Sequence, residues 1–187
     1  MRTAEDVIRF WFVDHGMDDW FGGKAEFDAA LAREFADTHP RVALGEAWEW
    51  RRTPEGRLAE IMVLDQFSRQ LHRGSPEAFA QDRMAVALTQ EAIAAGADQA
   101  IPMERRMFLF MPFMHAESLV IQEEGCRHFA QFGEEMMKFM TGHRDCIAQF
   151  GRFPFRNKAL GRMSTERSIS SSAGTTAGLL VTRCNRS

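Results

Sequence analysis

Apolar side chains recur every three or four residues along most of the chain, as they do on one face of an amphipathic helix. In residues 4–14, for example, Val7, Ile8, Trp11 and Phe12 form one apolar stripe. Similar stripes, separated by Gly or Pro, predict further helices along the chain. The predicted helices cover residues 4–14, 24–37, 44–48, 53–71, 75–95, 102–111, 115–124, 126–140 and 142–150.

The pattern indicates an all-α fold of eight or nine helices joined by short loops. No segment alternates apolar and polar residues convincingly enough to be a strand, and β-branched residues are scarce. Pro112 lies within an apolar run, so it either kinks one helix or separates two. Helical periodicity does not decide between a tetratricopeptide-like superhelix and a compact helical array.

The composition fits one helical domain, which we place at residues 1–163. The chain has 16 Phe, 4 Trp and 12 Met but no Tyr, which suits cores between helices. Residues 164–187 differ, because they contain six Ser and no aromatic residue. We expect a flexible Ser/Thr/Gly-rich tail there. It is either a natural terminus or the product of a reading-frame change near Glu166.

The net charge, the lengths of the apolar runs and the cysteine content disfavour several functional classes. The net charge of −3 provides no basic surface for nucleic acid, and no apolar run is long enough to span a membrane. Three dispersed Cys without a Cys-x-x-Cys pair indicate free thiols, a cytoplasmic location and no zinc site. We therefore expect neither a metal nor a cofactor.

Four blocks in order make the sequence similar to a known bacterial family. The blocks are 10–12 (FWF) with 20–21 (WF), 64–74 (LDQFSRQLHRG) with 78–82 (AFAQD), 113–117 (FMHAE), and 150–157 (FGRFPFRN) with 160–162 and 164–165. Together they resemble the family called domain of unknown function 924, over about residues 5–165. The resemblance implies an all-α fold of the tetratricopeptide-like class, and it implies no settled activity.

The chain departs from the pattern of that family at three places. Phe155 stands where the family usually has His, so a role of that His in relatives is not carried over. Ser68, Arg69 and Gln70 replace the usual Pro-Arg-Asn. After Thr165 the acidic, helical closing segment of the family is missing, which favours the reading-frame interpretation.

Two polar groups in the predicted helices could carry chemistry. Asp65 and Arg69 are four residues apart, so they share one helix face with Arg73. They form either a polar pocket or a buried ion pair that fixes helix docking. His115 and Glu117 follow Pro112, and His115 is either a general base with a carboxylate partner or a cap of the broken helix. The spacing of His115 and Glu117 does not fit a metal site.

A third group lies in the segment 151–157. Arg152, Arg156 and Asn157 surround a Pro turn, where the two guanidinium groups could bind a carboxylate or phosphate. The alternative is that these Arg cap helix ends and pair with Glu on neighbouring helices.

Three functions are compatible with these residues. The first is a binding module for a peptide or small anionic ligand, with Arg69, Arg73, Arg152, Arg156 and Asn157 in an aromatic-lined pocket. The second is a small hydrolase or lyase that uses His115 as base with Asp65 or Glu117. The third is a structural protein in which a surface rich in Phe and Met forms a homodimer. Convergence of His115, a carboxylate and an Arg would favour the enzyme.

Overall fold

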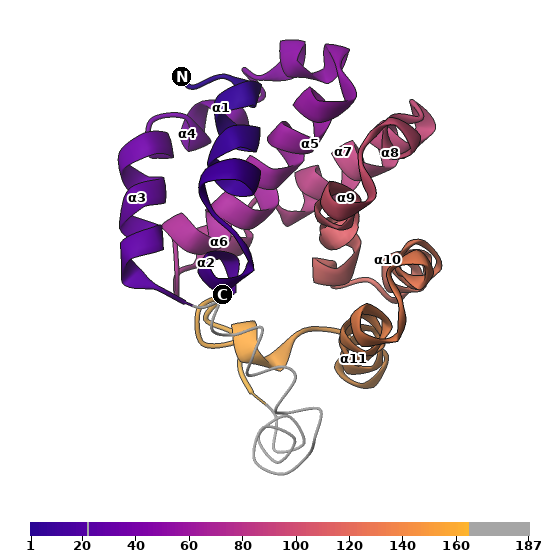
Figure 1. Ribbon diagram of the computed structural model, residues 1–187. Coiled ribbons are helices and arrows are strands. Elements are labelled where there is room, and N and C mark those ends of the chain that lie inside the picture. Colours follow the sequence, from indigo (N-terminus) through magenta and orange to yellow (C-terminus); the bar gives the residue numbers. More distant parts are fainter. Residues whose placement is uncertain (22, 165–187) are drawn as a thin grey trace.

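A computed structural model describes residues 1–21 and 23–164, so the predicted tail from residue 165 onward lies outside the described residues. Within the described ranges the chain forms helices and no strand, which confirms the predicted all-α class. The helices make a compact array (Figure 1). No helix in the described part of the chain has the length and hydropathy needed to cross a membrane.

The first half of the chain builds an aromatic core. Trp11 and Trp20 stack with ring centroids 5.6 Å apart, and the indole nitrogen of Trp20 donates a hydrogen bond to the carbonyl of Trp11 (3.0 Å). Phe27, Phe67 and Phe108 surround Trp11 on its other sides. The helical elements of this half are α1 (Ala4–Arg9), η1 (Phe10–Asp14), α2 (Met17–Trp20), α3 (Ala25–Phe35), α4 (His39–Ala43) and η2 (Trp48–Arg52).

A continuous helical stretch from residue 54 to residue 71 crosses the centre of the molecule, as predicted. Thr53 caps its start by accepting a hydrogen bond from the amide of Gly56 (3.1 Å). The stretch packs against α1 on one side and against α7 and α9 on the other. Its parts are α5 (Pro54–Met62), the π-helical segment η3 (Val63–Phe67) and α6 (Ser68–Leu71).

The second half continues as helices packed in succession. In it α9 contacts α7 and α10, and α10 contacts α11; the segment after α11 then returns below α2 and α6 (Figure 1). The elements are η4 (Pro76–Phe79), α7 (Asp82–Ala94), α8 (Ala97–Ala100), α9 (Met103–His115), α10 (Leu119–Phe129), η5 (Ala130–Phe132), α11 (Glu134–Phe150) and η6 (Pro154–Arg156).

Several predicted boundaries were wrong. The helix predicted at 75–95 is divided into η4 and α7. Of the two alternatives for Pro112, the structure shows a single helix, because α9 continues through Pro112 to His115. Gly125 does not separate two helices. It lies inside α10, where an added Cβ would be 2.9 Å from Met140 Cε, so its role is to let helices approach closely. The break comes at Gly133, whose φ of 85° favours glycine.

Candidate functional site

Asp65 is placed by the π-helical segment in the middle of the long central helix. A π-helical turn widens the helix by one residue, and such turns are frequent at functional sites. Asp65 is fully buried there. A buried carboxylate needs charged or hydrogen-bonding partners to offset its desolvation, and all of its partners come from side chains around this turn or from α9.

His115, the last residue of α9, is the principal partner of Asp65. Its Nδ1 lies 2.8 Å from one carboxylate oxygen of Asp65 and 3.0 Å from the other. Gln66 Nε2 donates to the same carboxylate (2.6 Å), and Arg69 Nη1 lies 3.0 Å from it. Only 1% of the Asp65 side chain is exposed, whereas 16% of the His115 side chain is exposed. The imidazole thus connects a buried carboxylate with the surface.

Asp82 extends this network to Arg156, in the segment after α11. Arg69 Nη2 lies 2.9 Å from one oxygen of Asp82, and Arg156 Nη1 donates to the other (2.8 Å). Arg156 Nη2 also donates to the main-chain carbonyl of His115 (3.0 Å). We refer to Asp65, Arg69, Asp82, His115 and Arg156 as the polar network. Four of its five members were predicted as site residues from the sequence.

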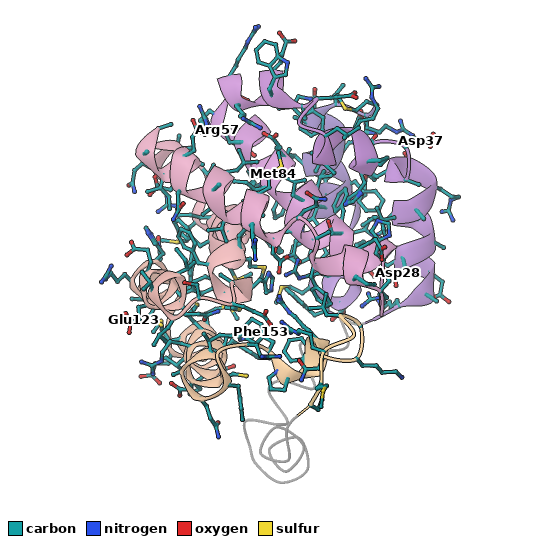
Figure 2. All side chains as sticks on the ribbon, turned by 180° about the vertical axis from the view of Figure 1, so that it is seen from behind. Asp28, Asp37, Arg57, Met84, Glu123 and Phe153 are labelled. Atoms are coloured by element: carbon teal, nitrogen blue, oxygen red, sulfur yellow. The ribbon has the colours of Figure 1, made fainter. Side chains whose placement is uncertain are left out.

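Aromatic rings hold the guanidinium group of Arg156 in place. Its central carbon lies 4.5 Å from the ring centroid of Phe79 and 4.6 Å from that of Phe153. Guanidinium groups are attracted to the faces of aromatic rings at such distances. The side chain of Phe153 is directed toward the interior of the molecule (Figure 2).

The charges of the network determine which nitrogen of His115 carries a proton. Burial would raise the pKa of Asp65, but Arg69 and His115 outweigh that effect and hold it below its ordinary value. Burial and the nearby Arg69 lower the pKa of His115, against the opposing effect of Asp65. The lowered pKa favours the neutral form of the His115 ring at pH 7. Because the ionised Asp65 only accepts hydrogen bonds, Nδ1 carries the proton and Nε2 has a lone pair.

His143 on α11 provides a second neutral imidazole beside His115. The two ring centroids are 6.4 Å apart. Nδ1 of His143 donates to the carbonyl of Phe139 (2.8 Å), and burial lowers the pKa of His143 to about 4. Within residues 1–21 and 23–164 no group of three or more His, Cys, Asp or Glu is arranged to hold a metal ion.

Glu117 was predicted as an alternative carboxylate for His115, and the structure brings it to other partners. Arg162 donates to both of its oxygens (2.6 and 2.8 Å), and the amide of Phe153 donates to one of them (2.7 Å). Burial would raise the pKa of Glu117, but Arg162 and the Phe153 amide lower it. Asp65 is thus the carboxylate that contacts His115.

Comparisons with known proteins agree with this architecture. The model of a bacterial protein family of unknown function, DUF924, matches residues 7–170. The chain belongs to the DUF924 family. It is also similar to a solved structure of a protein of unknown function from Agrobacterium tumefaciens, ATU0120. The two are 35% identical with a TM-score of 0.87 over 91% of this chain and 96% of the other. No curated protein matches the chain.

The remaining predicted residues of this DUF924 protein lie apart from the polar network. Arg73 pairs with Asp28 of α3 through both carboxylate oxygens (2.6 and 3.0 Å), and Arg152 is exposed. Asn157 is buried, and its amide nitrogen donates to the hydroxyl of Ser164 (3.2 Å). The structure therefore does not gather these three residues into one site with Arg69 and Arg156.

Two further residues were missed or misplaced by the sequence analysis. Asp82 was part of a family block but was given no role, although an acidic residue in a block with Phe79 was a usable signal. Ser68 was noted only as a departure from the family pattern and was given no role. Its hydroxyl donates to the carbonyl of Leu64 (2.6 Å) and lies 2.7 Å from Nε2 of His39.

Proposed function

We propose that this DUF924 protein is a hydrolase or lyase that acts on a small polar substrate, with His115 as general base and Asp65 as the carboxylate that orients it. The observation that carries the proposal is the contact of His115 Nδ1 with Asp65 at 2.8 Å, in a ring that is 16% exposed. An imidazole fixed in this way presents the lone pair of Nε2 for proton transfer.

In the hydrolytic form of the reaction, water is the nucleophile. Nε2 of His115 takes a proton from a water molecule while the water oxygen attacks the carbonyl carbon or phosphorus of an ester. The bond to the leaving oxygen then breaks, and the proton passes from Nε2 to that oxygen. Asp65 stabilises the imidazolium that exists between the two transfers. Ser68, held by His39 and Leu64, is not required as a nucleophile.

The contacts of the arginines favour acid–base chemistry over anion binding. Arg69 and Arg156 both contact Asp82, and Arg156 also binds the carbonyl of His115. A carboxylate or phosphate ligand would compete with these internal partners. The binding module therefore stands as the second candidate.

Generic chromogenic esters provide the test of the proposed function. We would measure hydrolysis of p-nitrophenyl acetate, p-nitrophenyl phosphate and bis-p-nitrophenyl phosphate by the native protein, His115→Gln and Asp65→Asn. We expect the native protein to hydrolyse at least one ester at least about 100-fold faster than either variant, which is the lower end of the range for general acid–base catalysis. Arg73→Gln, which changes a charge outside the polar network, is the matched control and should keep the native rate.

Equal rates for the native protein and His115→Gln on all three esters would contradict a hydrolytic role. The melting temperature of each variant, measured in parallel, separates loss of the base from loss of the fold. If phosphate or citrate raises the melting temperature of the native protein but not of Arg156→Gln, the anion-binding alternative is favoured instead.

A further inference from the structure

Glu117 connects two parts of the chain that are far apart in sequence. It lies in the turn between α9 and α10, two residues after His115. Its carboxylate accepts three hydrogen bonds from residues 153–162, at 2.6, 2.7 and 2.8 Å. Figure 1 shows this C-terminal segment returning from the end of α11 toward the opposite side of the molecule. Glu117 is thus an anchor for the segment beside the polar network.

The anchored segment carries Arg156 into the polar network. Arg156 is three residues after Phe153 and six before Arg162, the two residues that bind Glu117. Its side chain is 5% exposed and reaches both Asp82 and the carbonyl of His115. The ring of Phe153, whose amide binds Glu117, lies against the same guanidinium group. The position of Arg156 therefore depends on where Glu117 holds the segment.

We propose that Glu117 is a positioning residue for the His115–Asp65 pair: it fixes residues 153–162 so that Arg156 covers Asp82 and the carbonyl of His115 and limits access of water to the pair. The inference deepens the proposed function, because it names what controls the environment of the base. Its geometry does not depend on any substrate.

Loss of the Glu117 charge should change the pKa of the His115 imidazole. Gln at position 117 could still accept from the Phe153 amide, but it would lose the charge-assisted pairing with both nitrogens of Arg162. Once the segment is released, water reaches a larger part of the His115 ring, which is 16% exposed in the native structure. Because burial is the largest cause of the low pKa of His115, its pKa then rises toward the ordinary histidine value.

The test compares Glu117→Gln with Glu123→Gln in the full-length protein. Glu123 is exposed on α10 and lies at the outer edge of the molecule (Figure 2), so it is a matched control for charge and substitution. We would titrate His115 by nuclear magnetic resonance and measure its rate of modification by diethyl pyrocarbonate. For Glu117→Gln we expect the pKa to rise by about 0.5 or more and the modification at a fixed pH to accelerate at least about twofold. Glu123→Gln should match the native protein.

Arg162→Gln and Arg162→Lys add an independent check from the other side of the ion pair. Arg162→Gln should reproduce the change at His115, and Arg162→Lys, which keeps the charge, should restore part of the native behaviour. If Glu117→Gln and Arg162→Gln lower the melting temperature while the titration and modification of His115 stay native, Glu117 only stabilises the fold and the proposal is wrong. A change at His115 without ester hydrolysis in the native protein would overturn the hydrolase and leave the positioning role intact.

Discussion

The aromatic core and the polar network both include residues of the central helical stretch 54–71, but burial has opposite energetic consequences in the two regions. Phe67 packs in the core against Trp11, and Asp65, two residues earlier, is the buried charge of the network. Burial of aromatic rings stabilises the fold in proportion to the area removed from water. Burial of charges costs free energy unless each charge is paired. The core therefore explains why the protein is folded, whereas the network is the arrangement from which we propose chemistry at His115.

Trp11→Ala should have the largest effect on stability. Trp11 is completely buried among aromatic rings, and replacing such a residue by Ala costs about 3–5 kcal/mol. Urea denaturation would measure the loss. In the folded fraction the pKa of His115 should stay native, because the ring contacts of Trp11 are with other aromatic residues of the core. A shifted pKa of His115 in Trp11→Ala would show that the aromatic core and the polar network are not independent.

Arg69→Ala should destabilise the protein by about 3 kcal/mol, the lower end of the range for breaking a buried pair. The lower end is expected because Asp65 keeps His115 and Gln66 as partners. Unlike Trp11→Ala, this change should also raise the pKa of His115, since Arg69 helps to lower it. A loss below about 1 kcal/mol would place the pair with ordinary surface ion pairs.

Lowering the pH should destabilise the protein through His39 and His143. Burial lowers the pKa of each to about 4, in His39 with a contribution from His72. The unfolded chain binds a proton at each position near pH 6.5, but the folded chain does not, so stability falls as the pH drops from about 6.5 toward 4.

Between pH 7 and 5 we expect a loss of about 1–2 kcal/mol per histidine. Unfolding free energies measured across this range for the native protein, His39→Gln and His143→Gln would check it. Each variant should show a flatter pH dependence than the native protein. An unchanged slope in both variants would assign the acid sensitivity to other groups.

Arg73→Ala should have the smallest effect, below about 1 kcal/mol, because its pair with Asp28 is partly exposed to solvent. The titration of His115 should be unaffected, since Arg73 binds α3 rather than the polar network. A large loss of stability would mean that the ion pair between Asp28 of α3 and Arg73, in the turn after α6, contributes as much as a buried one.

Helical periodicity predicted the class of the fold and most helices, because it records which face of each helix is buried. It misplaced the end of α10, because Gly125 and Gly133 look alike in sequence. One permits close packing with Met140, and the other has a positive φ. Only the packed structure distinguishes these two uses of glycine.

In the candidate site, contacts between residues close in sequence could be predicted, whereas contacts between residues far apart in sequence could not. Asp65 and Arg69 are four residues apart on one helix, so their pairing followed from helix geometry. The partner of His115 is Asp65, fifty residues away, and not the neighbouring Glu117. Arg156 reaches Asp82 across an even longer separation. Local spacing carries no information about such contacts, which depend on how the helices pack.

Long-range proton–nitrogen correlation spectra of His115 at pH 7 give the most direct measurement of the state of the base. They distinguish the two neutral tautomers and the imidazolium from the nitrogen chemical shifts. We predict a neutral ring with the proton on Nδ1, a bare Nε2, and a pKa below the ordinary histidine value. A ring with the proton on Nε2, or an imidazolium at pH 7, would leave no lone pair for proton transfer at Nε2 and would contradict the proposed role of His115.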